Sequence, residues 1–309
     1  MPRVSVVIPT YNCAQFLGRT VDSALGQTYR DFEVIVVDDG STDETQTLMQ
    51  TYGESIHYLY QKNQGASAAR NVAVSRATGE FIAYLDADDM WSPEKLARQV
   101  EYLDAHPACG FVHTDVSVID ERDQVLHTRF NEETKRAVPQ GRCVRDVLLR
   151  SHIQTLTVLE RRSAFDSAQG FDLRLPVAQD YLHWILVVLH GFQVGYLHEP
   201  LGQYRWRAGS LMSSQRRLLN DVVKIYQIIL REEQLEKTYG AEMCRLVNER
   251  LYDTQRQLAY IERQDRLTAA ARQRILSLIR HRPFQFELYL DLLKTYFASH
   301  QPDQPLRPS

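Results

Sequence analysis

A run of carboxylates carries the strongest chemical signal in this chain. Asp86, Asp88 and Asp89 stand in Asp86-Ala87-Asp88-Asp89, directly after an apolar segment at 81–85. Burying several carboxylates together is unfavourable unless a cation neutralises them. Oxygen ligands of this kind suit Mg²⁺ or Mn²⁺, which commonly bridge to substrate phosphates. The run therefore predicts a divalent-metal site for a phosphate-bearing ligand. The alternative is a loop that caps the next helix, a role that suits Asp89 best.

Other polar groups follow apolar segments in the same way. Asp39 can accept hydrogen bonds from a nucleobase or a ribose; the alternative is a turn former, a role that suits Asp43 better. Arg70 can present a fixed donor fork to a diphosphate, and a plain surface arginine is the alternative. The polar clusters are Thr10-Tyr11-Asn12, Asp38-Asp39, Asn63-Gln64-Gly65 and Asp86 to Asp89.

The segments before these clusters alternate between strand and helix patterns. Repeated strand–helix units form a parallel sheet covered by helices, and ligands bind beyond the carboxyl ends of its strands. All four clusters are therefore expected at one edge of an α/β sheet. Ser92 is predicted to cap a helix that begins at Pro93. Apolar runs predict strands at 4–8, 32–37, 56–60 and 81–85, and helical spacing predicts helices at 14–27, from Thr42 or Asp43 to 52, and at 66–76.

The remainder of the chain changes character twice. Between 109 and 204 the pattern is mixed, and from 211 it is almost wholly helical, with a break at Pro283 and a frayed tail after His300. We therefore expect two domains, 1–210 and 211–309. In the mixed part we expect strands near 111–119, 125–130, 155–160 and 193–197, and helices near 144–150 and 179–190.

Composition excludes several classes of protein. The 309 residues have a formal net charge of −3, which does not favour nucleic-acid binding. The four cysteines lack the spacing of a metal knuckle, so reduced thiols in a cytoplasmic protein are expected. No apolar run is long enough for a signal peptide or a membrane span. Peripheral membrane contact through the arginine-rich helical end remains an alternative to a solvated face or a homodimer contact.

Five segments resemble the family 2 glycosyltransferases in order and spacing. The resemblance is strong over about the first third of the chain and weaker to about residue 210. The segments are Val4-Ser5-Val6-Val7-Ile8-Pro9-Thr10-Tyr11-Asn12, Ser23-x-Leu25-x-Gln27-Thr28, Val36-Val37-Asp38-Asp39-Gly40-Ser41-Thr42-Asp43, Asn63-x-Gly65-x-x-x-Ala69-Arg70-Asn71 and Gly79-Glu80-Phe81-Ile82-Ala83-Tyr84-Leu85-Asp86-Ala87-Asp88-Asp89.

The resemblance implies an α/β, GT-A-like fold with a mostly parallel sheet flanked by helices and a C-terminal helical extension. It also implies a nucleotide-diphosphate-sugar donor, with a UDP-sugar favoured, a divalent metal (Mg²⁺ or Mn²⁺) and inversion at the anomeric carbon. Asp86 and Asp88 are the expected metal contacts. The expected donor-binding residues are Pro9, Thr10, Tyr11, Asp39, Asn63, Arg70, Asp86, Ala87, Asp88 and Arg207.

An inverting transfer also needs a general base for the acceptor hydroxyl. The family usually supplies an Asp in a Glu-Asp pair at the start of a later helix, which matches Gln179-Asp180 here. Asp180 is therefore the predicted base, and a plain helix cap is the alternative. Relatives often carry His where this chain has Arg207, in a segment that runs from Pro200 to Ser210. Arginine cannot ligate a metal, so we expect Arg207 to contact the diphosphate or to play a structural part.

The sequence thus predicts an inverting, hexosyltransferase-type glycosyltransferase of polysaccharide biosynthesis. Its acceptor is expected to be a hydroxyl of a glycan or of a lipid-linked sugar. The alternatives are a catalytically silent nucleotide-sugar-binding subunit and a nucleotidyltransferase. A nucleotidyltransferase would carry a glycine-rich basic loop after the first strand, which Thr10-Tyr11-Asn12-Cys13 lacks. Trp184 is expected in the core, and His113, His152 and His183 are expected to be satisfied polar residues rather than ligands.

Overall fold

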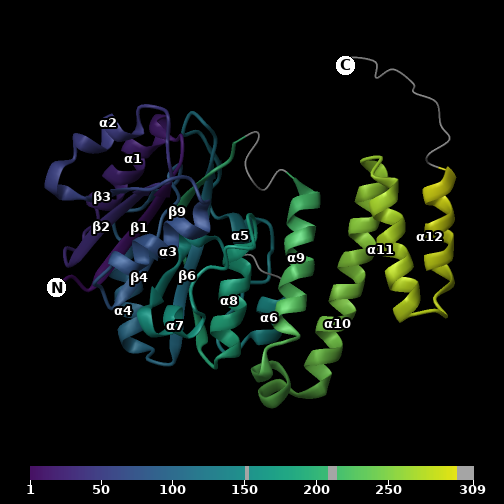
Figure 1. Ribbon diagram of the computed structural model, residues 1–309. Coiled ribbons are helices and arrows are strands. Elements are labelled where there is room, and N and C mark those ends of the chain that lie inside the picture. Colours follow the sequence, from purple (N-terminus) through teal and green to yellow (C-terminus); the bar gives the residue numbers. More distant parts are fainter. Residues whose placement is uncertain (150–152, 208–213, 298–309) are drawn as a thin grey trace. The chain divides into compact units, whose positions relative to one another are not determined.

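A mixed β-sheet forms the centre of the first part of the chain (Figure 1). The computed structural model describes residues 1–149, 153–207 and 214–297. Within them the strand order is β3-β2-β1-β4-β8-β6-β9-β5, with β7 paired to β6. The strands are β1 (Val4–Thr10), β2 (Phe32–Asp38), β3 (His57–Tyr60), β4 (Phe81–Tyr84), β5 (Met90–Trp91), β6 (Cys109–Ile119), β7 (Val125–His127), β8 (Leu159–Arg161) and β9 (Gln193–Arg205).

The parallel half of the sheet follows the sequence prediction closely. β1 pairs in parallel with both β2 and β4, and β2 pairs in parallel with β3. Every residue of β1 is buried, as expected for a central strand covered on both faces. β3 lies at the edge, and its two end residues are exposed. The carboxyl ends of β1, β2 and β4 therefore lie at one edge of the sheet, each followed by one of the polar clusters.

Helices cover both faces of this sheet. Residues of α1 and α4 share one apolar core with alternate residues of β1, β2 and β4. On the other face, Trp184 of α8 packs against Tyr84 and Phe111. The helices are α1 (Ala14–Leu25), α2 (Thr45–Gln50), α3 (Ala66–Arg76), α4 (Lys95–Ala105), α5 (Phe130–Glu133), α6 (Val144–Leu149), α7 (Arg162–Ser167) and α8 (Gln179–Leu189), with 3₁₀ turns at Gly53–Ser55 and Thr155–Thr157.

The structure corrects several predicted boundaries. Ser92 does not cap α4, because the segment from Ser92 makes a tight turn, in which Lys95 N donates to Ser92 O, before the helix begins. The predicted strand at 155–160 begins as a 3₁₀ turn, because Thr157 Oγ1 bonds Gln154 O and this local bond competes with strand pairing. The predicted strand at 125–130 ends early, at His127, and residues 130–133 form α5 instead.

The sheet also departs from a purely parallel order. β8 is antiparallel to both β4 and β6, between which it lies. β9 is much longer than predicted and pairs in parallel with β6 as far as Arg205. Two irregularities in that pairing lie one on each side of Asp115. They allow β9 to contain Pro200 and still pair with β6. This length carries β9 to the same edge as the ends of β1, β2 and β4.

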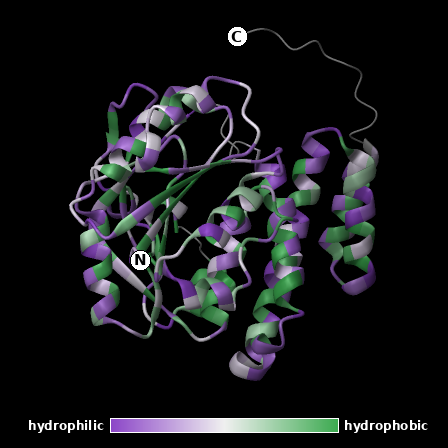
Figure 2. Ribbon diagram, turned by 60° about the vertical axis from the view of Figure 1, so that its left-hand side comes forward, coloured by the Kyte–Doolittle hydropathy of each residue, from purple (hydrophilic) through white to green (hydrophobic). Residues whose placement is uncertain are grey.

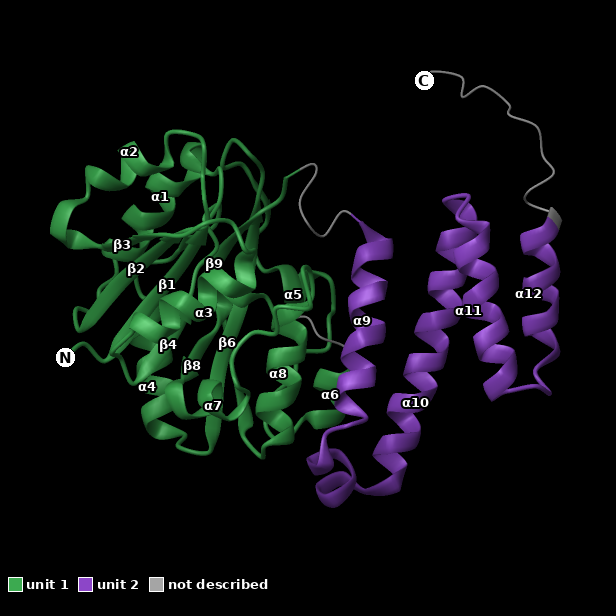
Figure 3. Ribbon diagram, in the orientation of Figure 1, with its two compact units in different colours: residues 1–210 green, residues 211–309 purple. Residues whose placement is uncertain are grey.

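The chain divides into two compact units, residues 1–210 and 211–309 (Figure 3). The predicted boundary, Ser210, His152 and the tail after His300 all lie outside the described residues. Along the helices of unit 2, hydrophobic and hydrophilic residues alternate (Figure 2). Among the described residues no helix is both long and apolar enough to cross a membrane. The helices are α9 (Gln215–Ile229), α10 (Glu233–Gln264, kinked at Gly240), α11 (Thr268–His281) and α12 (Phe286–Phe297).

Candidate active site

Asp39 organises the loop that follows β3. Its carboxylate accepts hydrogen bonds from Gln61 Nε2 at 2.7 Å, Gln64 N at 2.9 Å and Gly65 N at 2.7 Å. Its own N–H donates to Thr10 O at 2.8 Å. The buried Asp39 side chain therefore ties together the polar clusters after β1, β2 and β3. One acceptor position remains on Oδ2, because this oxygen accepts only one of the three bonds.

Two glycines make this junction possible. Gly40 has φ +86°, and a Cβ there would lie 2.9 Å from Asn63 N, so a side chain would push the two loops apart. Gly65 has φ +91° immediately before α3. The left-handed region is open to glycine at no steric cost. Asp43 plays the part expected of it, because its carboxylate accepts the N–H of Thr45, the first residue of α2.

Arg70 lies buried on α3 and makes an ion pair with Asp86. The guanidinium also lies 5.6 Å from the ring centroid of Phe171. Burial alone lowers the pKa of Arg70, but the charges of Asp86 and Asp180 more than offset this, so its pKa is raised. The surface alternative for Arg70 is therefore wrong. Arg70 is the fixed positive charge between the acidic loop after β4 and the start of α8.

Asp88 pairs with a different arginine. Its Oδ2 lies 2.5 Å from Arg207 Nη2. The pKa of Asp88 is raised, first by burial and then by the charge of Asp86, while Arg207 opposes both. The negative charges also affect Tyr204. Burial and the charges of Asp89, Asp88 and Asp86 raise the pKa of Tyr204 to about 12. Asp86 and Asp88 thus repel each other in a partly buried place, where a cation is favoured.

Asp89 has a structural role that differs from the one expected. It does not cap a following helix, because β5 and a turn come first. Instead its buried Oδ1 accepts the N–H of Arg205 at 2.7 Å, which fastens the end of β9 to the acidic loop. The Arg205 side chain completes the junction by donating to Asp88 O at 2.8 Å. The pKa of Asp89 is raised well above the ordinary value by burial and by Asp88 and Asp86.

Asp180 begins α8 and faces the same group of charges. Its Oδ2 accepts a hydrogen bond from Thr155 Oγ1 at 2.8 Å, and its Oδ1 accepts the N–H of Tyr181 at 2.8 Å. Burial raises the pKa of Asp180, while Thr155 and Arg70 lower it and Asp86 raises it. The net increase makes this carboxylate a stronger base than an exposed aspartate. Thr155 was not predicted from the sequence, because a lone threonine in a mixed segment carries no motif.

Gln179 directly precedes Asp180, at the position where family 2 glycosyltransferases usually have Glu. It contacts Arg70. With its amide oriented to satisfy both neighbours, it accepts from Arg70 Nη1 at 2.7 Å and donates to Val177 O at 2.9 Å. A buried network lies nearby, in which Glu160 accepts from the Tyr84 hydroxyl and lies 2.9 Å from His183 Nε2. As expected, His183 is a satisfied polar residue and Trp184 belongs to the core. His113 is also buried, but it is only partly satisfied: its Nε2 lies 3.0 Å from Pro139 O, whereas its Nδ1 has no partner among the described residues.

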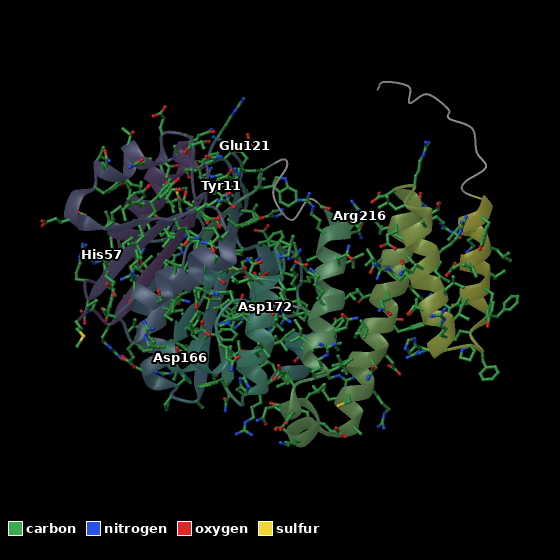
Figure 4. All side chains as sticks on the ribbon, viewed as in Figure 1. Tyr11, His57, Glu121, Asp166, Asp172 and Arg216 are labelled. Atoms are coloured by element: carbon green, nitrogen blue, oxygen red, sulfur yellow. The ribbon has the colours of Figure 1, made fainter. Side chains whose placement is uncertain are left out.

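The remaining predicted donor-site residues lie around this edge with fewer contacts. Pro9 and Thr10 are buried at the end of β1, and Thr10 Oγ1 has no partner among the described residues. Tyr11 is 52% exposed and is labelled in the upper part of unit 1 in Figure 4, while Asp166 lies in the lower part. Asn63 is exposed, and Ala87 is buried, with its carbonyl accepting from Thr20.

Asp86 and Asp88 are the carboxylates at this edge that could bind a divalent cation. In the described part of the chain, no group of three or more His, Cys, Asp or Glu residues is placed to hold a metal ion. Asp86 and Asp88 offer two carboxylates whose mutual repulsion is only partly relieved by Arg70 and Arg207. A cation held by one or two carboxylates, with its other positions filled by substrate phosphates and water, is the usual arrangement for Mg²⁺. The residues therefore fit a metal that arrives with a diphosphate.

Residues 5–165 match the family model described as glycosyl transferase family 2. The chain belongs to this family. TuaG of Bacillus subtilis, a putative teichuronic acid biosynthesis glycosyltransferase, is 32% identical over 246 residues, covering 77% of this chain and 92% of that protein. WfaP of Escherichia coli, a UDP-Glc:α-D-GlcNAc-diphosphoundecaprenol β-1,3-glucosyltransferase, is 29% identical over 217 residues, covering 70% and 82%.

Solved structures show the same fold for this family 2 glycosyltransferase. TarS residues 1–349 of Staphylococcus aureus with UDP-GlcNAc align with a TM-score of 0.70 at 21% identity, covering 96% of this chain and 89% of that one. The mannosyltransferase PcManGT of Pyrobaculum calidifontis with GDP-Man and Mn²⁺ gives 0.62 at 18% identity, covering 96% and 85%. The predicted fold class, a GT-A-like mostly parallel sheet with flanking helices, is confirmed.

Proposed function

We propose that this glycosyltransferase moves a sugar from a UDP-sugar to a hydroxyl of a glycan or lipid-linked acceptor, with inversion and with Asp180 as the base. The observation that carries the proposal is that Asp180, Arg70 and Asp86 interact although they come from three separate segments. In this proposal the diphosphate of the donor binds on the side of Asp86 and Arg70. Asp180, whose pKa is raised, faces that side.

The donor part of the proposal draws on the relatives and on the edge of the sheet. WfaP is named for a UDP-glucose donor and a lipid-linked acceptor, and a TarS structure holds UDP-GlcNAc. In this chain Thr10, Tyr11 and Asp39 lie at the ends of β1 and β2, where a nucleotide binds in open α/β sheets. The free acceptor position on Asp39 Oδ2 suits an N–H of the base.

In the proposed reaction, Asp86 and Asp88 would hold Mg²⁺ or Mn²⁺, which would neutralise charge on the leaving diphosphate. Arg70 is buried and keeps its charge, so it orients the diphosphate without reorganising. Arg207 exchanges its contact with Asp88 for one with a phosphate oxygen. Asp180 Oδ2 accepts the acceptor's proton while the acceptor oxygen attacks the anomeric carbon from the side opposite the diphosphate.

The test is a donor screen with purified full-length protein. UDP-sugars are incubated with Mn²⁺, and release of UDP is followed over hours, with EDTA as the metal-free control. Slow UDP release from one donor, lost on chelation, supports the proposal. Thermal shift measured in parallel reports donor binding, because a ligand of the folded state raises the melting temperature. Binding without turnover, in the presence of mixed glycan acceptors, would instead favour a silent nucleotide-sugar-binding subunit.

A further inference from the structure

A cavity of about 670 Å³ lies between β6, β9 and the segment 129–140, lined by none of the residues assigned above. Cavities of several hundred cubic ångströms are typical of small-molecule sites. We call it the side pocket. Asp115 lies at its base, and the lining residues on which the argument depends are Arg129, Asn131, Lys135, Arg136, Tyr196 and His198.

The floor of the side pocket contains an unsatisfied amide. Asn131 is only 2% exposed, and its Oδ1 accepts no hydrogen bond from any described residue. Its amide nitrogen has only the Tyr196 hydroxyl beside it. Asp115 does not satisfy this oxygen, because its carboxylate is itself an acceptor and binds the backbone N–H groups of Val116, Asn131 and Glu132. A buried acceptor without a donor is unfavourable, so the floor is suited to a ligand hydroxyl.

The rim of the side pocket is positively charged. Within the described ranges, neither Lys135 nor Arg136 has a carboxylate partner, and Arg136 lies 4.5 Å from the ring centroid of Phe130. Arg129 is anchored by Glu132 at 2.6 Å and by His198 O at 2.6 Å, yet its buried Nε has no acceptor. Three cations, Arg129, Lys135 and Arg136, outnumber the two carboxylates of the lining, Asp115 and Glu132, so the pocket favours an anionic group. A ligand that satisfies both rim and floor carries a negative charge and hydroxyl groups together.

Ring contacts connect the strands that line the side pocket with α8, the helix that carries Asp180. Phe111 and His113 of β6 contact each other, and they contact Trp184 of α8 and Tyr196 of β9 respectively. The pocket thus opens on the sheet face that α8 covers, and Asp180 begins α8. Four strand positions separate Asp115 from the end of β6 at Ile119, roughly 13 Å at the usual rise per residue. A chain of a few sugar units can span such a distance.

We propose that the side pocket is an acceptor subsite that binds a negatively charged saccharide unit, carrying either a carboxylate or a phosphate. Arg129, Lys135 and Arg136 bind the charge, and Asn131 Oδ1 accepts a sugar hydroxyl. The assignment to the acceptor rests on the proposed transferase function. The binding itself does not, because it needs neither donor nor metal.

Saturation-transfer NMR on the full chain tests the subsite without donor or metal. The probes are glucuronate, glucose 1-phosphate, glucose and inorganic phosphate. We expect saturable transfer to glucuronate, to glucose 1-phosphate or to both, and at least about tenfold weaker binding of glucose, which lacks the charge. The preferred charged probe then tells whether the natural unit carries a carboxylate or a phosphate. Competition by inorganic phosphate as strong as that of the charged sugars would show an anion site without sugar recognition, and would overturn the proposal.

Paired variants locate the binding. Lys135→Gln with Arg136→Gln should weaken charged-sugar binding by at least about tenfold. Arg122→Gln, an exposed arginine in the turn between β6 and β7, is the matched control and should leave binding unchanged. Asn131→Ala should weaken binding of the charged sugars but not of inorganic phosphate; its melting curve shows whether it folds, and the Lys135/Arg136 pair decides the question if it does not. No saturable binding, or binding unchanged in that pair, refutes the subsite, whereas failure of the transferase proposal would appear separately as no UDP release from any donor.

Discussion

Two polar regions of unit 1 differ in how their charges are balanced. At the donor edge, formed by Asp39, Arg70, Asp86, Asp88 and Asp180, almost every charged group already has a protein partner. In the side pocket, considering only the residues that the structure describes, Lys135 and Arg136 have no carboxylate partner, and Asn131 keeps an unsatisfied oxygen. The charged groups of the donor edge are therefore paired without ligand, whereas those of the side pocket would be paired by a ligand.

This difference has a physical consequence for each region. A paired, buried charge is held in one geometry, so it can stabilise a transition state without reorganising. Removing one partner there leaves the other charge buried and uncompensated, so substitutions should have large effects. Exposed, unpaired cations contribute to binding through charge alone and should tolerate conservative change.

Asp180→Asn should have the largest effect. The amide keeps the size of the carboxylate but cannot accept the acceptor's proton, so transfer should fall by about 10²–10⁴-fold. Donor binding should persist, because Asp86, Asp88 and Arg70 are untouched. UDP release with acceptor and thermal shift with UDP-sugar measure the two quantities. Asp166→Asn, an exposed change in the lower part of unit 1 in Figure 4, is the control and should retain activity. A fully active Asp180→Asn enzyme would remove Asp180 from the mechanism.

Asp88→Asn should reduce transfer by roughly 10²–10³-fold, the range seen when one charge-stabilising group is lost. It also frees Arg207, whose guanidinium lies 2.5 Å from this carboxylate. We expect the Mn²⁺ needed for half-maximal UDP release to rise strongly, because one of the two proposed carboxylate ligands is gone. A manganese titration measures this. An unchanged metal requirement together with reduced turnover would mean that Asp88 acts only through Arg207.

Arg207→Gln and Arg207→Lys separate two roles of this arginine. If it binds the diphosphate through charge, Lys should retain most activity and Gln should raise KM for the donor by about tenfold. If it only neutralises Asp88, Gln should change the manganese requirement more than KM, while Lys, which keeps the positive charge, should change both less. Donor and manganese titrations on the two variants distinguish these outcomes. Equal KM values in Gln, Lys and the natural protein would exclude the diphosphate contact.

The sequence predicted the donor edge better than the rest of unit 1, for reasons that lie in particular residues. Gly40 must be glycine because its φ is positive and Asn63 lies against it, and β1 must be apolar because both its faces are covered. Such constraints leave a pattern that sequence reasoning can find. Asp89 was misassigned because its partner is a backbone N–H that lies 116 positions away. No local pattern records such a contact.

The same limit explains what was missed further along the chain. Thr155 reaches Asp180 across 25 positions from a turn that resembles the start of a strand. The long β9 contains a proline, which argues against a central strand, but irregular pairing near Asp115 accommodates it. Asn131 and Lys135 carry no motif, and in the described part of the chain Asn131 Oδ1 accepts no hydrogen bond and Lys135 has no carboxylate partner. Residues that meet only in three dimensions, or only in the presence of ligand, leave no spacing to detect.

Thr155→Val should have the smallest effect and the most specific one. Valine keeps the shape of threonine but loses the hydroxyl that donates to Asp180 Oδ2 at 2.8 Å. That bond stabilises the ionised carboxylate, so losing it should raise the pKa of Asp180 further. The base works only when ionised, so activity is lost as pH falls through this pKa. The acid limb of kcat/KM should therefore move to higher pH, with only a few-fold loss above it.

Thr155→Ser supplies the matched control, because it restores the hydroxyl and should return the acid limb to its natural position. A pH profile of kcat/KM between pH 5 and pH 9 measures all three proteins. If Val lowers activity equally at every pH, Thr155 merely packs beside the base and does not set its protonation. If the limb moves in Val and returns in Ser, a single hydrogen bond tunes the base, and Asp180 depends on its protein partner as the other donor-edge charges do.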